Sequence, residues 1–270
     1  MHGICGLCHK SKNLKDSHFM PKSIYRSISK GFPEIGDNIV LISGHEKTAA
    51  YNSKQAKKHL LCEECENKFS RNGENIVIPL MAKPNGFKLA RAIKKFKLLS
   101  CANNEIWYFP PNDDLAKAFM YFAISIAWRL SSADWGNFGI PETKGIIRGE
   151  YIKIFSDFLM GKTDTPNDTY LAVYVHNRNV DLPFMCFPTV KNHEGYQHII
   201  FYIPGIRFSL LVGEKPGKGI LETFSINKTK VYFVSRNLKS HPEHKFIVNF
   251  AKHEAKAKGN LAKELSAKNV

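Results

Sequence analysis

Four of the six cysteines form two Cys-x-x-Cys pairs, and this spacing is typical of metal ligands. The pairs are Cys5-Gly6-Leu7-Cys8 and Cys62-Glu63-Glu64-Cys65. Two thiolates at this spacing can bind one metal ion from a single turn, and two such pairs complete the ligand set of a tetrahedral zinc site. The sequence therefore predicts a structural Zn²⁺ bound by Cys5, Cys8, Cys62 and Cys65. A closed site of four cysteines supports folding and does not by itself imply catalysis.

Two segments near these cysteines carry further side chains that can do chemistry. Asp16-Ser17-His18-Phe19-Met20-Pro21-Lys22 lies between the pairs, and Leu60-Leu61-Cys62-Glu63-Glu64-Cys65-Glu66 contains the second pair. Here the sequence resembles the HNH endonuclease superfamily, and most closely a prokaryotic subgroup with Ser-His-x-x-Pro-Lys and Leu-Leu-Cys-x-x-Cys-Glu segments. Trp128-Arg129 is similar to a further feature of that subgroup. The resemblance is specific over residues 5–75, faint to about residue 130, and absent beyond it.

The resemblance implies a metal-dependent endonuclease that hydrolyses DNA phosphodiester bonds, with a role in prokaryotic defence. His18 matches the general base of the family, and an imidazole suits this role because its pKa lies near neutral pH. Ser17 stands where an acidic residue usually precedes that histidine. Lys58 stands where a central asparagine is expected, so Asn67 is the candidate replacement for the orienting amide. The predicted catalytic residues are therefore His18, Ser17 and Asn67.

The resemblance also implies a catalytic divalent ion, Mg²⁺ or Mn²⁺, which offsets the charge of the phosphate and of the leaving oxygen. Glu66 matches the last residue of the family's motif, and its carboxylate is a ligand that both ions accept. Asp16 and Glu74 are further candidate ligands. His9, His45 and His59 are close enough in sequence to replace a missing ligand, and the sequence favours none of the three.

The charge of the chain favours a polyanionic partner. Thirty-nine basic residues against 24 acidic ones give a net charge of +15, and residues 1–100 alone hold 18 basic and 8 acidic side chains. A nuclease must hold the phosphate backbone before cutting it, and basic side chains supply that affinity. The predicted nucleic-acid contacts, to DNA or alternatively to RNA, are Lys22, Arg26, Lys58, Lys68, Arg71, Lys94 and Lys95.

The elements that must position these residues follow from hydrophobic spacing. Residues 86–99 suit a basic amphipathic helix, and residues 113–130 suit a core helix that Asp113 or Asp114 caps. Residues 150–160 suit a third helix, which Gly161 ends. Short runs rich in β-branched and aromatic residues predict an antiparallel sheet; they cover 170–176, 197–203, 207–212 and 230–234.

These elements predict an α+β fold. Residues 1–80 form a zinc-stapled ββα-metal (treble-clef-like) module, as the resemblance implies. Residues 81–250 form a helical and antiparallel-sheet domain, and residues 251–270 form a basic helical tail that frays. The larger domain carries no catalytic motif, so we expect it to orient the module or to contact a protein partner or a second copy. Met1-His2-Gly3-Ile4-Cys5 lacks the pattern of a signal peptide, which predicts a cytoplasmic protein without membrane contact.

Two other functions agree with the same residues. In the first, the protein is a zinc-stapled nucleic-acid-binding protein without catalysis, and the changes at Ser17 and Lys58 record lost activity. In the second, the zinc module is a scaffold that binds protein partners. Replacement of His18 separates the nuclease from the first alternative, and the salt dependence of nucleic-acid affinity separates both from the second.

Overall fold

In a computed structural model, the described residues are 1–31, 39–43, 46–52, 55–102, 105–136, 143–178, 184–214, 216, 224 and 229–268. The strands are β1 (His2–Ile4), β2 (Ser11–His18), β3 (Ile39–Ser43), β4 (Thr48–Asn52), β5 (Lys57–Cys62), β6 (Ala82–Lys83), β7 (Gly86–Phe87), β8 (Leu98–Ala102), β9 (Glu105–Tyr108), β10 (Thr169–His176), β11 (Cys186–His193), β12 (Tyr196–Ile203), β13 (Ile206–Gly213), β14 (Val231–Arg236) and β15 (Lys256–Ala257). The α-helices are α1 (Lys22–Gly31), α2 (Glu63–Phe69), α3 (Asn75–Val77), α4 (Lys88–Ala92), α5 (Asp113–Ser132), α6 (Gly149–Met160), α8 (Pro242–His253) and α9 (Gly259–Lys268). Shorter turns are the π-turn η2 (Ser70–Glu74) and the 3-10 turns η3 (Ile78–Leu80), η4 (Ile93–Lys95) and η6 (Leu238–Ser240). The fold is therefore mixed α+β, as the sequence predicts.

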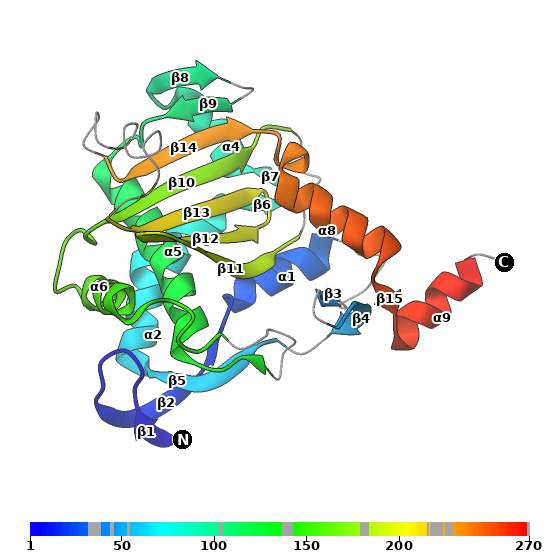
Figure 1. The fold of residues 1–270 in the computed structure, drawn as a ribbon, viewed down its shortest axis with the longest axis horizontal. Coiled ribbons are helices and arrows are strands. Elements are labelled where there is room, and N and C mark those ends of the chain that lie inside the picture. Colours follow the sequence, from blue (N-terminus) through cyan, green and yellow to red (C-terminus); the bar gives the residue numbers. More distant parts are fainter. Residues whose placement is uncertain are drawn as a thin grey trace.

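A seven-stranded sheet forms the larger part of the molecule (Figure 1). Its strand order is β11-β12-β13-β10-β14-β9-β8. Neighbouring strands are antiparallel as predicted, except that β10 and β14 are parallel. The hydrophobic runs of the sequence locate β10, β12, β13 and β14, whereas β8, β9 and β11 are not predicted because their alternation of polar and apolar residues is weak.

The helix α5 is the centre of the hydrophobic core. It is buried on all sides from Ala118 to Ser131, which is expected of a helix enclosed by other elements. On one side Phe119 stacks against Phe208 of the sheet, and on the other Trp128 meets Phe69 of α2 edge to face. Figure 1 shows α5 between the sheet and α2. One cluster of buried hydrophobic side chains therefore joins the two predicted domains.

The predicted helix ends agree with the structure for α6, and two other predictions about helix ends need correction. Gly161 ends α6 in the left-handed conformation (φ 77°), as predicted. The cap of α5 is Asn112, whose side-chain oxygen accepts from the amide of Leu115 at 2.8 Å, and not Asp113 or Asp114. The helix predicted at residues 86–99 is shorter, because β7 occupies its start and the chain becomes extended again at β8.

The C-terminal segment folds back onto residues 39–52. β15 pairs in parallel with β4, and Tyr51 donates a hydrogen bond of 2.6 Å to Glu264 of α9. In Figure 1 this segment runs from α8 through β15 to α9 beside β3 and β4. The predicted helical tail is therefore helical at the end of α8 and in α9, whereas β15 between them, which pairs with β4, was not predicted from the sequence.

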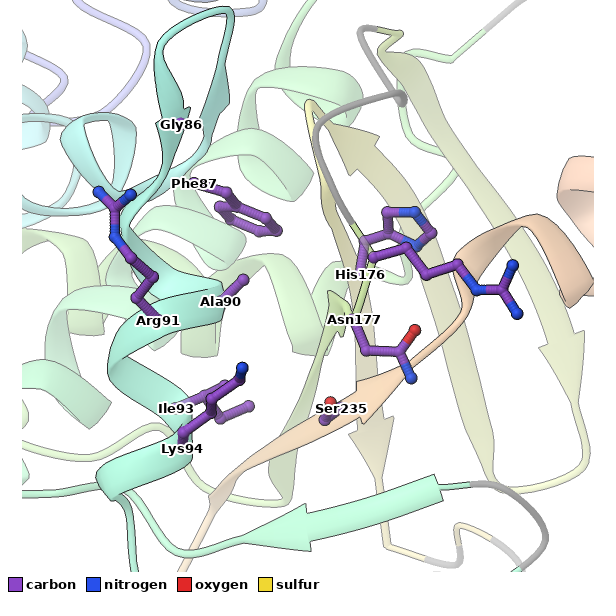
Figure 2. Close-up of a pocket in the computed structure, with 10 residues that line it drawn as sticks. Gly86, Phe87, Ala90, Arg91, Ile93, Lys94, His176, Asn177 and Ser235 are labelled. Carbon is purple, nitrogen blue, oxygen red and sulfur yellow. The ribbon is translucent and has the colours of Figure 1, made fainter.

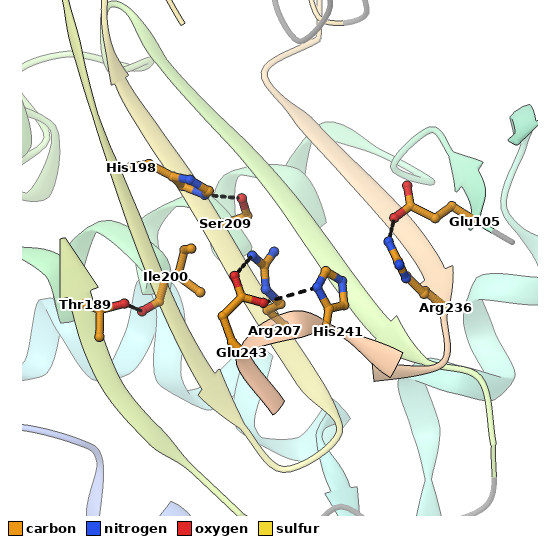
Figure 3. A network of polar contacts seen from close by, with 9 residues as sticks. All are labelled: Glu105, Thr189, His198, Ile200, Arg207, Ser209, Arg236, His241 and Glu243. Atoms are coloured by element: carbon orange, nitrogen blue, oxygen red, sulfur yellow. Dashed lines mark hydrogen bonds and ion pairs between the residues drawn. The ribbon is translucent and has the colours of Figure 1, made fainter. Parts of the chain in front are cut away.

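The sheet also carries buried polar groups on the face away from α5 (Figure 3). Arg207 and Ser209 alternate along β13 with Phe208 and Leu210, which face the core. Arg207 donates to Glu243 of α8 at 3.0 Å, and Ser209 lies 2.7 Å from His198. The ion pair of Arg207 with Glu243 attaches α8 to this face of the sheet.

Candidate functional site

The four cysteines of the two pairs meet in one cluster. Their sulfur atoms all lie within 4.8 Å of one another, and the Sγ atoms of Cys8 and Cys62 are 3.9 Å apart. With Zn–S bonds of about 2.3 Å, a tetrahedral site places its sulfur atoms about 3.8 Å apart. The prediction that Cys5, Cys8, Cys62 and Cys65 come together is confirmed, and the cluster is compatible with a structural zinc site.

Tight local turns present the four sulfur atoms to one another. Between β1 and β2 the amide of Cys5 donates to Lys10, and that of His9 to Cys5, with His9 in the left-handed region (φ 57°). Cys62 ends β5 and Cys65 lies one turn into α2, so the strand-to-helix junction directs both thiols the same way. The amide of Cys62 donates to the sulfur of Cys5 at 3.3 Å. The turn that carries Cys62 and Cys65 is therefore bonded to the turn that carries Cys5 and Cys8.

The thiol pKa values reflect this crowding. Burial raises the pKa of Cys65, and the charge of Cys5 raises it further. Burial also acts to raise the pKa of Cys5, but amide donors from Cys8 and Cys62 bring it to about 7. Four thiolates repel one another without a cation, and Zn²⁺ offsets that repulsion. The donor set fits zinc.

His18 is the last residue of β2, four residues beyond Leu14, which lies opposite Cys62 of the cysteine cluster. β2 pairs with β5 in antiparallel register, with Asp16 opposite His59 and His18 opposite Lys57. Residues directly opposite in such a pair share a face, and alternate residues of one strand also share it. Asp16, His18, Lys57 and His59 therefore lie on one face of the β2–β5 pair. Of the three histidines that the sequence left equivalent, His59 shares this face, His9 lies in the turn between β1 and β2, and His45 lies outside the described residues.

Ser17 points away from this face, which argues against the predicted catalytic role. Its side chain is buried, and its hydroxyl oxygen accepts a hydrogen bond of 3.1 Å from the amide of Leu61. The register of β2 and β5 shifts between Lys15 and Asp16, so this bond satisfies a backbone group beside a β-bulge. Ser17 is a structural residue of the bulge. Lys58 lies opposite Ser17, on the side away from His18.

His18 has the protonation state of a general base. Burial lowers the pKa of its imidazole, and the positive charges of Lys22 and Lys57 lower it further. The carboxylates of Asp16 and Glu66 act in the opposite direction without reversing the shift. The ring is therefore neutral near pH 7 and can accept a proton. The backbone around it is held firmly, because Phe19 is fully buried and its amide donates to Ala56 at 2.8 Å.

Glu66 belongs to a buried charged group that includes Glu74 and Arg129. The guanidinium of Arg129 is 2% exposed, donates from Nη2 to Oε1 of Glu74 at 2.8 Å, and lies 3.9 Å from Oε2 of Glu66. It also covers the ring of Phe69 at 4.7 Å. The position of Arg129 in the sequence gives no sign of the two carboxylates that it joins.

The π-turn η2 brings Glu66 and Glu74 to the same side of their helix. Two α-helical turns contain about 7.2 residues, so positions eight apart would diverge by roughly 80°. In η2 the amide of Asn75 donates to Ser70, five residues earlier, which adds one residue to the turn. Two turns then contain about eight residues. Both carboxylates can therefore reach one guanidinium.

Three polar atoms of this group are buried without a hydrogen-bond partner among the described residues. They are Oε1 of Glu66 and the Nε and Nη1 atoms of Arg129. Buried polar atoms are rarely left unsatisfied in proteins, so a water molecule, an ion or a substrate group is expected there. The free oxygen of Glu66 makes it the best placed of the candidate ligands for a divalent ion.

The predicted catalytic metal ligands do not form one cluster. Asp16 pairs with Lys57, and Glu74 is bonded to Arg129. Among the described residues, only the four cysteines form a group of three or more potential metal ligands. Asn67 is exposed one position beyond Glu66 on α2. Of the predicted residues, the structure thus brings His18 and Glu66 into one electrostatic environment and directs Asp16 and Glu74 to basic partners.

The predicted nucleic-acid contacts are spread over several elements. Lys22 and Arg26 are exposed on α1, beginning four residues after His18. Lys68 is half-buried near the end of α2, and Arg71 is exposed in η2. Lys94 and Lys95 are both exposed in η4. All seven side chains, including the half-buried Lys58 and Lys68, are therefore open to solvent at least in part.

Comparison with known proteins adds no family. No protein-family model matches the chain, and no curated protein or solved structure is significantly similar to it. Within the described part of the chain, none of the helices has both the length and the apolar character needed to cross a membrane.

Proposed function

We propose that this protein is a metal-dependent HNH-type endonuclease that hydrolyses DNA phosphodiester bonds, with His18 as the general base. The observation that carries the proposal is the placement of His18. His18, with a neutral imidazole, is the last residue of β2, and the four-cysteine cluster connects the start of this strand to α2. The negative charge of Glu66 on α2 acts on the imidazole. A base and a carboxylate are thus held together by strand pairing and by the predicted zinc.

In the proposed reaction His18 removes a proton from a water molecule. The water oxygen bonds to phosphorus, the bond from phosphorus to the leaving oxygen breaks, and that oxygen is protonated from solvent. A divalent ion held by Glu66, with Asp16 or His59 as the candidate second ligand, would neutralise charge on the phosphate and the leaving oxygen. Arg129 acts as a positioning residue, because its bond to Glu74 keeps the guanidinium beside Glu66.

The basic side chains provide the affinity for DNA in this proposal. Lys22 and Arg26 on α1 follow directly after the strand of His18 and carry no ion pair within the described residues. Each contact to a phosphate releases condensed counterions, so affinity is expected to fall steeply with salt. The contacts are to the backbone, which agrees with hydrolysis that is not restricted to one base sequence.

One observation favours a second candidate, a zinc-containing nucleic-acid-binding protein without catalysis. Asp16 and Glu74, two of the three predicted ligands of the catalytic ion, are occupied by Lys57 and Arg129. Glu66 then remains as a carboxylate without a second acidic ligand. This candidate retains the zinc cluster and the DNA affinity but lacks hydrolysis.

The test is a cutting assay with zinc-loaded protein on plasmid and on single-stranded DNA. The buffer is low in salt, and Mg²⁺, Mn²⁺ or Ni²⁺ is added in turn. We expect metal-dependent cutting that falls by at least about a hundredfold in His18→Ala, since a positioned general base contributes about that much. The matched control is His253→Ala, which changes an exposed histidine at the end of α8.

The outcomes distinguish the candidates. Cutting that is equal in wild type and His18→Ala would reject His18 as the base. Binding of DNA without cutting under any of the metal conditions would support the non-catalytic candidate. Binding that is weak and insensitive to salt would favour the scaffold for protein partners.

A further inference from the structure

A pocket of about 210 Å³ lies outside the β2–β5–α2 unit, between α4 and the ends of two strands of the large sheet. Phe87, Ala90 and Lys94 line it from β7, α4 and η4, and Asn177 and Ser235 line it from beyond β10 and from β14. Figure 2 shows Lys94 extending toward the opening, with Asn177 and Ser235 on the opposite wall. Of its lining residues, only Lys94 is among the predicted nucleic-acid contacts.

Backbone hydrogen bonds keep its walls together. The amide of Ala82 in β6 donates to Pro204 at 2.9 Å, and the amide of His176 donates to Gly205 at 2.9 Å. The β6–β7 hairpin and the end of β10 are therefore both attached to the turn between β12 and β13. A pocket between fixed backbone segments is largely preformed, which is typical of small-ligand sites.

The lining of the pocket carries positive charge and no negative charge. Arg91, Lys94 and Arg178 line it and are exposed, and none of its lining residues is acidic. No ion pair joins these three side chains to a carboxylate within the described part of the chain. By contrast, the buried Arg129 and Arg207 both have glutamate partners. Three such cations around one concave surface favour an anionic ligand.

One of the three cations, Arg91, lies close to the backbone of Gly86. Gly86 has φ 135°, and a Cβ atom at this position would come within 3.0 Å of Nη1 of Arg91. The glycine thus leaves room for the guanidinium, which in Figure 2 lies on the Gly86 side of the pocket, away from Asn177 and Ser235. A larger residue would be strained at this φ and would displace the side chain.

The remaining lining groups define the shape of the anion. Asn177 and Ser235 are neutral hydrogen-bonding groups, and Phe87 and Ala90 give an apolar wall. Arginine and lysine bind phosphate oxygens through charge-assisted hydrogen bonds, and a small apolar wall suits the group that the phosphate is attached to. We propose that this pocket binds a phosphomonoester, through Lys94 and the added positive charge of Arg91 and Arg178 at its rim. The phosphate belongs either to a free nucleotide or to the phosphorylated end of a nucleic-acid strand.

The test is calorimetric titration of the whole zinc-loaded protein with AMP and with adenosine, without added divalent ions. Because no cutting is measured, failure of the nuclease proposal does not affect it. We expect AMP to bind at one site and adenosine to show no binding. The double variant Lys94→Glu with Arg178→Glu should bind AMP at least about tenfold more weakly, since it loses two charge-assisted contacts.

The matched control is the double variant Lys88→Glu with Lys245→Glu. Both lysines are exposed, on α4 and α8, do not line the pocket, and give the same change in net charge. Equal weakening in the two double variants would overturn the proposal, because only the overall charge would then matter. Absence of saturable AMP and phosphorylated-oligonucleotide binding to the wild type would also overturn it.

A second titration distinguishes the two sources of the phosphate. A short oligonucleotide with a 5′-phosphate is compared with the same oligonucleotide ending in a 5′-hydroxyl. If the phosphate improves binding only when the pocket cations are present, and beyond the affinity of AMP, the ligand is a strand end. If AMP binds as well as the phosphorylated oligonucleotide, the ligand is a free nucleotide.

Discussion

Glu74 and Arg129, 55 residues apart in the sequence, are joined by a hydrogen bond of 2.8 Å from Nη2 to Oε1. The guanidinium is 2% exposed, and the same nitrogen lies 3.9 Å from Glu66. This bond connects η2, which continues from α2, to the central helix α5. It therefore controls the position of the carboxylate that the proposed mechanism uses.

Glu74→Gln should destabilise the protein by about 3 kcal/mol, because it leaves the buried guanidinium without its closest counter-charge. Urea unfolding, followed by circular dichroism, measures this loss. The control is Asp164→Asn, which removes an exposed partner of Lys117 and should have no measurable effect. Equal stability of Glu74→Gln and wild type would show that the ion pair does not hold the helix.

Cys62→Ser should abolish zinc binding. The wild type is expected to carry one zinc per chain by elemental analysis. Because metal binding contributes directly to folding, losing it should cost about 3 kcal/mol or more, which lowers the Tm by roughly 6–12 °C. Cys101→Ser, at an exposed cysteine outside the cluster, is the control. Wild-type zinc content in Cys62→Ser would contradict the assignment of the four cysteines as zinc ligands.

Ser17→Ala should lower stability and leave cutting nearly unchanged. The substitution removes the acceptor for the buried amide of Leu61, at a cost of about 1–3 kcal/mol. Thermal unfolding and the cutting rate are measured side by side, with Ser11→Ala at the exposed start of β2 as control. If Ser17→Ala lost cutting while its stability stayed unchanged, Ser17 would have a catalytic role after all.

The cutting rate should rise with pH and level off below pH 6.5. His18 acts as a base only when neutral, and burial lowers its pKa from the ordinary value of 6.5. Protonation at lower pH removes the base, so the rate falls as the pH drops through the shifted pKa. A pH–rate profile at constant ionic strength measures this. A half-maximal rate above pH 6.5 would contradict the assignment of the titration to a buried His18.

Glu243 should stabilise the protein in a pH-dependent way. A hydrogen bond from His241 and the charge of Arg207 lower its pKa from the ordinary value of 4.5. The folded state thus binds this proton less readily than the unfolded state, so the stabilisation is present above about pH 4.5 and is lost as the pH falls further. The difference in unfolding free energy between wild type and Glu243→Gln should be about 3 kcal/mol at pH 7 and shrink below pH 4. A difference independent of pH would contradict the ion pair seen in Figure 3.

Several features were predictable because their signal is local. The spacing of the cysteine pairs is enough to place each pair in one turn, and the structure brings all four sulfur atoms together. The apolar repeat from Leu115 to Leu130 is long enough to specify α5, and Gly161 is enough to end α6. In each case the structure of the segment depends only on residues close together in the sequence.

Other features could not be predicted from the sequence because the deciding contact is distant. Residues 86–99 have helical spacing, but β8 pairs with β9 and takes the end of that segment into the sheet. Glu74 has the composition of a metal ligand, but Arg129 of α5 binds its carboxylate. Asp16 is likewise engaged by Lys57 of the neighbouring strand. No local pattern encodes such partners.

The sequence by itself determined the four-cysteine cluster and the mixed α+β class, since spacing and hydrophobic period suffice for both. Only the tertiary structure decided which faces these residues occupy. The β-bulge beside Ser17 turns that hydroxyl inward, and the π-turn aligns Glu66 with Glu74. Both irregularities insert or shift a single residue and so change which side chains meet. Neither is visible in the spacing of polar and apolar residues along the sequence.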